Sequence, residues 1–168
     1  MPDLTFILGG ARSGKSRRAE DIIAGHPPPW TYVATAQAFD DEMRQRIRDH
    51  QDRRDGRWTT FDTPLDLEDM LRRQPQGRPV LVDCLTLWLT NVMLAGEDVA
   101  TRCERLAGVM AQPSGPWVVV ANEVGLGIVP DNALARRFRD EAGRLNQMVA
   151  KVANNVEFVV ADLPMKVK

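Results

Sequence analysis

The stretch that decides the fold reads LTFIL at residues 4–8 and runs directly into GGARSGKS at residues 9–16. The second part satisfies the pattern GxxxxGK[ST], which is informative where it follows a strand and opens a helix. That context is present, because an apolar run precedes the loop and an amphipathic stretch, residues 15–24, follows it. The sequence therefore predicts a phosphate-binding loop at the end of a first buried strand.

Each residue type in this loop has a physical role in binding phosphate. Glycines let the backbone approach the anion closely, successive N–H groups point at it, and the helix N-terminus adds about half a positive charge. Lys15, the only lysine before Lys151, would reach the β and γ phosphates, and the Ser16 hydroxyl would bind Mg²⁺. The alternative is a glycine turn that begins an exposed helix and binds nothing. The candidate loop residues are Gly9, Gly10, Ala11, Arg12, Ser13, Gly14, Lys15 and Ser16.

Further apolar runs and amphipathic stretches alternate along the chain. The clearest helix, residues 132–154, has apolar side chains along one face, and Asp131 is its expected cap. Near-continuous apolar runs are typical of strands buried on both faces of a parallel sheet. We therefore predict an α/β fold, a P-loop NTPase-like, mostly parallel sheet flanked by helices in a single domain, 1–168, with 165–168 as an optional last strand. The expected strands are 4–8, 30–34, 79–83, 117–121 and 156–160, and the other expected helices are 15–24, 40–53, 65–73, 85–94 and 99–111.

Composition excludes several classes of protein. Lys plus Arg number 22 against 23 Asp plus Glu, so the chain lacks the basic surplus that is typical of nucleic-acid binders. A hydrophobic share of 43% argues against disorder. Cys84 and Cys103 are too few for a disulfide framework, which favours a reducing cytoplasm. The N-terminal apolar stretch is too short for a signal peptide or a membrane span.

Two acids follow apolar runs, at the edge where parallel sheets bind ligands. Asp83 comes directly after residues 80–82 and would hold Mg²⁺ or contact nucleotide, unless it caps the following helix. Glu123 comes after the strand at 117–121 and would orient Mg²⁺ or an acceptor hydroxyl, unless it pairs with a nearby arginine.

A P-loop admits GTPase switches, motors and small-molecule kinases. Guanine switches read the base with NKxD, whereas the strand ends here read NEVG at 122–125 and NNVE at 154–157. A kinase of a small alcohol is therefore favoured. His50 follows Met43 and Ile47 at steps of seven and three, on one face of the expected helix. A neutral imidazole is a competent nucleophile toward phosphorus, although a structural histidine is the alternative.

These motifs together resemble a known family. GGARSGKS at 9–16, DDEM with RIxxH at 40–50, Trp58 with Thr60, NEVGLGIVP at 122–130 and RRFRDEAGRLNQ at 136–147 are similar to the bifunctional adenosylcobinamide kinase and adenosylcobinamide-phosphate guanylyltransferase family of cobalamin synthesis. The resemblance covers essentially the whole chain. Two departures stand out: QDRRDGRW at 51–58 lacks a proline common in the family, and Asp62 replaces a commoner Glu.

The resemblance implies two reactions and a set of site residues. The aminopropanol hydroxyl of adenosylcobinamide would be phosphorylated by a nucleoside triphosphate, ATP or GTP, and GMP would then pass from GTP through a guanylylated His50 to give adenosylcobinamide-GDP. It also implies a homotrimer. A monofunctional P-loop kinase and a nucleotide-gated regulatory protein are the alternatives. By resemblance, His50 is the nucleophile, and it joins Lys15 as a catalytic residue, while Ser16 and Asp83 remain the expected Mg²⁺ ligands from the loop motif and the strand end. By the same resemblance, nucleotide contacts beyond the loop come from Ala34, Thr35, Ala36, Gln51, Asp52, Arg53, Arg54, Asp62 and Asp83.

Overall fold

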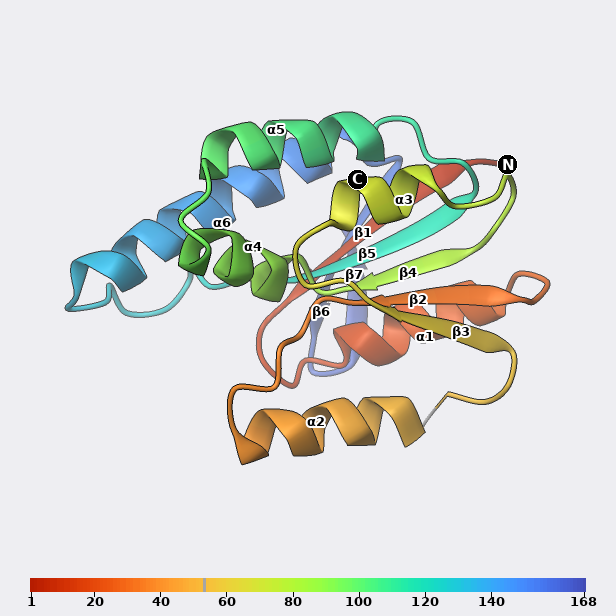
Figure 1. Ribbon diagram of the computed structural model, residues 1–168, viewed down its shortest axis with the longest axis horizontal. Helices are drawn as coiled ribbons and strands as arrows, with labels where there is room; N and C mark the ends of the chain where they lie inside the picture. Colours follow the sequence, from red (N-terminus) through yellow and green to blue (C-terminus); the bar gives the residue numbers. More distant parts are fainter. Residues whose placement is uncertain (53) are drawn as a thin grey trace.

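The computed structural model describes residues 1–52 and 54–168, except for the side chains of Arg46 and His50. In the described part, the strands form one seven-stranded sheet of order β3-β2-β4-β5-β1-β6-β7 (Figure 1). The strands are β1 Asp3–Gly9, β2 Trp30–Ala34, β3 Trp58–Asp62, β4 Val80–Asp83, β5 Pro116–Asn122, β6 Asn155–Val160 and β7 Leu163–Lys166. The helices are α1 Lys15–Ala24, α2 Asp41–Asp52, α3 Leu67–Arg72, α4 Leu85–Leu94, α5 Val99–Met110 and α6 Ala133–Val152.

Parallel pairing brings the carboxyl ends of β1, β2, β4 and β5 to one edge of the sheet. All neighbours from β3 to β6 pair in parallel, and only β7 runs antiparallel, against β6. Gly9 of β1 lies opposite Asn122 of β5, and Ala34 of β2 lies opposite Asp83 of β4. The carboxyl ends of the central strands therefore share the edge where open α/β sheets bind ligands.

Helices cover both faces of the sheet, as Figure 1 shows. The helices α3, α4, α5 and α6 lie on one face, and α1 and α2 lie on the other. The larger apolar core lies on the first face, around Trp88 and Leu89, which are fully buried. A smaller core around Ile7, Ile23 and Leu81 fills the α1 side. Each such side chain contributes roughly 1.5–3 kcal/mol to folding through burial.

The predicted architecture is confirmed, with one strand missed. The missed strand is β3, which has the sequence WTTFD. Its residues 59–62 are exposed, and it lies at the edge of the sheet. An edge strand with polar side chains lacks the apolar run that identified the others. The C-terminal tail does form a strand, β7, although it begins at Leu163 rather than at Met165.

The predicted bounds 15–24 and 85–94 are confirmed by α1 and α4, and the ends of the other helices differ from the predicted bounds by at most two residues. The expected cap Asp131 is wrong: Asn132 has extended backbone, and its side-chain oxygen accepts from the Ala135 N–H at 2.8 Å. The helix expected from residue 65 begins at Leu67, because the Leu65 carbonyl accepts hydrogen bonds from Trp88 and Arg102. Capping contacts of this kind depend on local geometry that hydrophobic periodicity does not carry.

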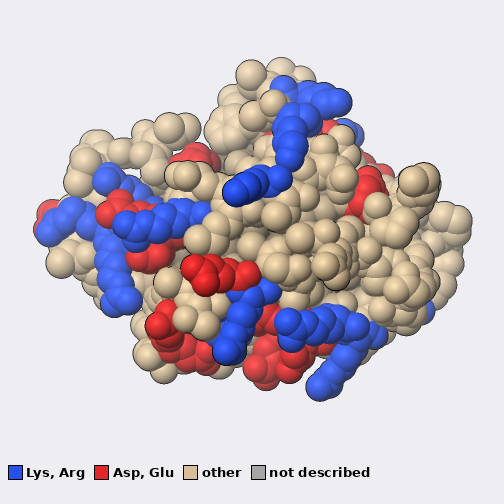
Figure 2. Space-filling view, turned by 90° about the horizontal axis from the view of Figure 1, so that it is seen from above, with Lys and Arg blue, Asp and Glu red and all other residues tan. Residues whose placement is uncertain are grey.

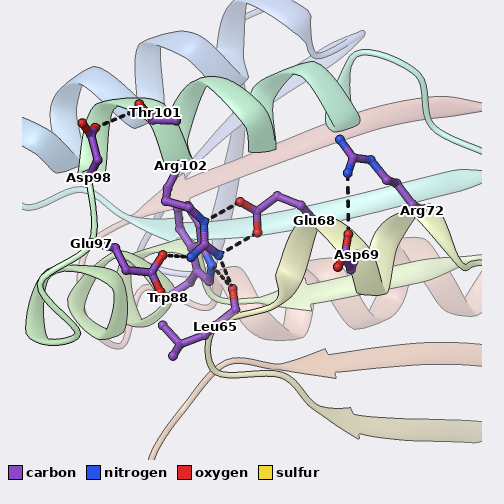
Figure 3. A network of polar contacts seen from close by, with 9 residues as sticks. All are labelled: Leu65, Glu68, Asp69, Arg72, Trp88, Glu97, Asp98, Thr101 and Arg102. Carbon is purple, nitrogen blue, oxygen red and sulfur yellow. Dashed lines mark hydrogen bonds and ion pairs between the residues drawn. The ribbon is translucent and has the colours of Figure 1, made fainter.

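A buried ion cluster joins three of the helices on the larger-core face (Figure 3). Arg102 of α5 donates to both carboxylate oxygens of Glu68 of α3, at 2.7 and 2.9 Å, and also to Glu97. Its guanidinium lies 5.6 Å from the ring of Trp88 of α4. The hydrogen bonds with Glu68 raise the pKa of Arg102. This cluster ties α3, α4 and α5 together with a cation whose donors are satisfied by the protein itself.

The outer surface carries charges of both signs. Figure 2 shows Lys and Arg interspersed with Asp and Glu on the side of α5, without one large field of a single sign. Among the described residues, no helix combines the length and apolar character that crossing a membrane requires.

Candidate functional site

Backbone crowding explains the glycines of the loop between β1 and α1. A Cβ on Gly9 would collide with the Ser13 side chain and would stand 2.8 Å from the Val159 carbonyl oxygen. Gly14 has φ +96°, a conformation that L side chains rarely adopt, and a Cβ there would collide with the carboxylate of Asp162. A larger residue at either position would therefore clash, so the loop needs glycine at both Gly9 and Gly14.

Lys15 is the first residue of α1, and its side chain contacts the preceding loop. The residue is only 9% exposed, and its Nζ donates to the Gly10 carbonyl at 2.9 Å. The neighbouring Ser13 hydroxyl is buried and has no hydrogen-bond partner within the described part of the chain. A cation, a helix N-terminus and a buried hydroxyl thus meet at one loop, as an anion site requires.

The β6–β7 turn supports the loop from the other side. The Asp162 N–H donates to the Ser13 carbonyl at 2.8 Å, and the Asp162 carboxylate pairs with Arg17 at 3.2 Å. Ala161 and Asp162 both have positive φ, 50° and 65°. Sequence reasoning missed this contact, since residues 13 and 162 are brought together only by the pairing of β1 with β6.

A cavity of about 170 Å³ opens between the phosphate loop and α2. Its walls come from the loop, from the ends of β2, β4 and β5, and from α2 with the segment that follows it. The lining residues are Lys15, Ser16, Tyr32, Ala34, Ala36, Met43, Ile47, Gln51, Arg54, Asp83, Cys84, Leu87 and Asn122.

One buried tyrosine joins the acid and the cation of this cavity. The Tyr32 hydroxyl donates to Asp83 Oδ2 at 3.2 Å, and the Arg54 guanidinium lies 3.6 Å from the centre of the Tyr32 ring. Burial, and then the charge of Asp83, raise the pKa of Tyr32 well above its ordinary value, so the phenol stays a neutral donor. Arg54 Nε and Nη1 are buried and lack a hydrogen-bond partner among the described residues.

A second polar contact holds the backbone at this edge. Thr35 is fully buried, and its hydroxyl donates to the Cys84 carbonyl at 2.6 Å and accepts from the Cys84 N–H at 2.9 Å. Asn91 of α4 donates to the carbonyls of Thr35 and Pro64, at 2.8 and 2.9 Å. Burial raises the pKa of the Cys84 thiol to about 11, so it stays protonated at neutral pH. The Thr35 side chain is therefore engaged with the protein, whereas Ala34 and Ala36 face the cavity.

The structure places the residues predicted from the sequence in four different situations. Asp62 and Asp52 are exposed and do not line the cavity. Arg53 lies outside the described residues, and His50 falls within the span of α2 while its side chain lies outside the description. Glu123 accepts from the Gly125 N–H at 2.6 Å and so shapes its own turn. Those that do line the cavity are Lys15, Ser16, Ala34, Ala36, Gln51, Arg54 and Asp83.

Sequence reasoning missed several of the lining residues, with Tyr32 foremost. The one signal that could have found Tyr32 is its position two residues before Ala34, which places both side chains on the same face of β2. Asn122 could have been found as the last residue of an apolar run that parallels β1. Of the remaining lining residues, Met43 and Ile47 belong to the DDEM and RIxxH motifs, whereas Cys84 and Leu87 carry no motif.

The donor set at the cavity fits Mg²⁺ only when a nucleotide shares the coordination. Ser16 and Asp83 offer a hydroxyl and a carboxylate, the hard oxygen ligands that Mg²⁺ prefers beside phosphate and water. No group of three or more His, Cys, Asp or Glu residues gathers as a metal site in the part of the chain that is described. The site therefore suits a metal that arrives with phosphate oxygens.

Solved structures share the fold at low sequence identity. An ATPase from the type III secretion system of pathogenic bacteria superposes with a TM-score of 0.58 at 12% identity, over 96% of this chain and 52% of that chain. The flagellar accessory protein FlaH from Methanocaldococcus jannaschii gives a TM-score of 0.55 at 12% identity, over 100% of this chain and 80% of that chain. At such identities, the similarity supports the fold alone.

Sequence comparisons are more specific. The family described as "Cobinamide kinase / cobinamide phosphate guanyltransferase" matches residues 5–167. The "Bifunctional adenosylcobalamin biosynthesis protein CobP" of Pseudomonas aeruginosa is 48% identical over 171 residues, which cover 100% of this chain and 98% of that protein. The "Bifunctional adenosylcobalamin biosynthesis protein CobU" of Salmonella typhimurium is 38% identical over 181 residues, covering 98% and 99%. A protein of the same description from Escherichia coli is 36% identical over 181 residues, with the same coverage.

Proposed function

This chain belongs to the cobinamide kinase / cobinamide phosphate guanyltransferase family and is an enzyme of cobalamin biosynthesis, and on that premise we propose how its residues carry out two reactions. In the first, the aminopropanol hydroxyl of adenosylcobinamide attacks the γ-phosphorus of a nucleoside triphosphate and the diphosphate leaves. In the second, an imidazole nitrogen of His50 attacks the α-phosphorus of GTP and releases pyrophosphate. The substrate phosphate then displaces the imidazole, which yields adenosylcobinamide-GDP.

The observation that carries the proposal is the unsatisfied cation at the cavity. Two guanidinium nitrogens of Arg54 are buried without a hydrogen-bond partner in the described structure. Leaving a buried charged donor unpaired is costly, and a phosphate oxygen would satisfy it with a charge-assisted bond. The same cavity is lined by Lys15 from the phosphate loop. Two cations at one cavity suit the polyphosphate of a nucleotide.

The loop residues would hold the phosphates in both reactions. The N–H groups at the start of α1 and the Lys15 ammonium would stabilise charge on the transferring γ-phosphoryl group and on departing pyrophosphate alike. Ser16 and Asp83 would hold Mg²⁺, which neutralises phosphate charge when bound. One anion site can therefore serve two chemistries.

The assignment of His50 as nucleophile rests on the resemblance and on helical spacing. The positions of α2 that line the cavity, Met43, Ile47 and Gln51, recur every four residues. This repeat supports the expectation that the helix presents one face to the nucleotide. His50 lies within the span of that helix.

Assembly and location complete the proposal. Between β5 and α6, the side chains of Leu126, Ile128 and Val129 are exposed, as is Leu134 at the start of α6. A cluster of exposed apolar side chains is typical of a protein contact, which supports the proposed homotrimer. Both cysteines are buried and unpaired, which supports a reducing, cytoplasmic setting.

Incubation with GTP labelled at the α-phosphate tests the chemistry. We expect a label on the chain that is acid-labile and base-stable, and that His50→Ala abolishes while kinase turnover survives. An unlabelled protein with kinase activity would support the monofunctional kinase instead. Nucleotide hydrolysis without any cobinamide-dependent product would support the nucleotide-gated regulator.

A further inference from the structure

Tyr32 lies at the junction of two groups that would face the nucleotide. Its hydroxyl contacts Asp83 Oδ2 at 3.2 Å, and its ring face carries the Arg54 guanidinium at 3.6 Å. Asp83 ends β4, whereas Arg54 follows α2, so the two residues come from separate elements of the fold. Tyr32 touches both and is only 4% exposed.

Neighbouring aromatic rings hold the Tyr32 ring in place. Trp58 of β3 meets it edge-on, with ring centres 6.1 Å apart, and Trp30 meets Trp58 at 5.0 Å. Trp30 and Tyr32 share one face of β2, and Trp30 lies opposite Trp58 in the register. The ring therefore offers a rigid platform, with little freedom to follow a moving arginine.

The polar contacts of Tyr32 exceed what packing in the core requires. A phenylalanine would fill the same volume, and the hydroxyl is needed only for Asp83. Arg54 gains an aromatic face on one side while its buried Nε and Nη1 stay without a protein partner among the described residues. The aromatic face thus holds the guanidinium plane without using its hydrogen-bond donors.

We propose that Tyr32 is a positioning residue for the nucleotide: its hydroxyl orients the Asp83 carboxylate, and its ring holds the Arg54 guanidinium with its donors available to phosphate. The inference rests on the proposed function of the cavity. Tyr32 touches no reacting atom in this scheme. Its two contacts set the spacing between Asp83, which would bind Mg²⁺, and Arg54, which would bind the phosphates.

Two substitutions separate the two contacts. Tyr32→Phe keeps the platform and removes the hydroxyl, and Tyr32→Leu removes both. Dissociation constants for GTP, measured by calorimetry with Mg²⁺ and again in EDTA, report binding without any need for turnover. Tyr32→Phe should weaken binding about fivefold with Mg²⁺ and leave binding in EDTA unchanged. Tyr32→Leu should weaken binding about tenfold in EDTA, through loss of the platform, and about fiftyfold with Mg²⁺, where the hydroxyl is lost as well.

A matched control and a double variant make the test specific. Arg57 lies over Trp30 at 4.6 Å, but it pairs with Asp55 and does not line the cavity. Arg57→Ala should leave both dissociation constants unchanged. In EDTA, the double variant Tyr32→Leu with Arg54→Ala should bind GTP about as weakly as Arg54→Ala alone, because the platform acts through the arginine.

The outcomes separate this inference from the proposed function. If the wild-type chain binds no GTP in either condition, the proposed function fails. If the wild type binds GTP and Tyr32→Phe keeps the full enhancement by Mg²⁺, the role of the hydroxyl is overturned. Additive losses for Tyr32→Leu and Arg54→Ala in EDTA would overturn the role of the platform. Because Tyr32→Phe preserves volume, the test of the hydroxyl does not depend on the folding of the leucine variant.

Discussion

Two arginines of this protein, Arg102 and Arg54, stand in opposite situations. Arg102 donates to Glu68, to Glu97 and to the Leu65 carbonyl, in a cluster on the face of the sheet covered by α3, α4 and α5 (Figure 3). Arg54 stacks on Tyr32 at the cavity, and two of its nitrogens lack a partner in the described part of the chain. Both guanidinium groups lie near an aromatic ring, so the ring does not distinguish them.

The difference lies in what satisfies the hydrogen-bond donors. Where the protein supplies carboxylates and a carbonyl, the arginine connects elements of the fold. Where the described residues supply a ring face and leave two buried nitrogens without a partner, those donors remain for a ligand, and ligand binding would offset the cost of leaving them unpaired. Removing the first arginine should therefore affect stability, and removing the second should affect binding.

The largest effect is expected for Arg102→Ala. The substitution leaves Glu68, whose side chain is 9% exposed, without its cation, and breaking a buried pair costs about 3 kcal/mol or more. Urea unfolding should show a midpoint lowered accordingly, while GTP affinity of the folded protein stays unchanged. An unfolding midpoint equal to that of the wild type would show that the cluster contributes no net stability.

Arg54→Ala should give the reverse result. Loss of charge-assisted bonds to phosphate should weaken GTP binding about 10- to 100-fold. The free energy of unfolding without nucleotide should stay the same or rise, because the substitution removes two buried nitrogens that have no partner among the described residues. Calorimetry and urea unfolding on one preparation measure both quantities. A loss of stability with unchanged affinity would reverse the comparison.

A third arginine, Arg18, pairs with Glu157, and the contribution of this pair to stability should depend on pH. Bonds from Arg18 lower the pKa of Glu157 below its ordinary value of 4.5. A depressed pKa in the folded state adds stability above the ordinary pKa, and this stability is lost as pH falls through the lower, folded-state value. Unfolding curves at pH 7 and at decreasing acid pH should therefore show a steeper acid loss in the wild type than in Glu157→Gln. Parallel curves for both proteins would contradict this reading.

The smallest effect is expected for Arg57→Ala. Arg57 pairs with Asp55 at 2.7 Å, but both side chains are more than half exposed, at 58% and 54%. Solvent screens such pairs, so neither the unfolding midpoint nor GTP affinity should change measurably. A clear loss of either would show that an exposed arginine on an aromatic ring acts as the buried one does.

Local patterns were enough for the phosphate loop and for most of the sheet. Gly9 through Ser16 could be recognised because the motif, the preceding strand and the following helix are contiguous. Buried parallel strands have apolar runs of their own, so β1, β2, β4, β5 and β6 could be predicted one at a time. The edge strand β3 could not, because its exposed side chains carry no such run.

The candidate site was predicted less completely, for a different physical reason. The resemblance placed Arg54 and Asp83 at the site, but neither motif nor periodicity could place Tyr32 between them. It also proposed Thr35 as a nucleotide contact, whereas the structure commits the Thr35 side chain to Cys84. Which atoms of a side chain are already satisfied depends on neighbours distant in sequence.

Sequence alone determined that a strand, a glycine loop and a helix would follow one another and that apolar strands would assemble in parallel. Those features are encoded within short windows, through backbone conformation and hydrophobic burial. Only the tertiary structure decided that the β6–β7 turn supports the loop, that Arg102 is satisfied and that two buried nitrogens of Arg54 have no partner in the described part of the chain. Hydrogen-bond satisfaction is a property of three-dimensional contacts, so residues of one type can stabilise the fold at one place and await a ligand at another.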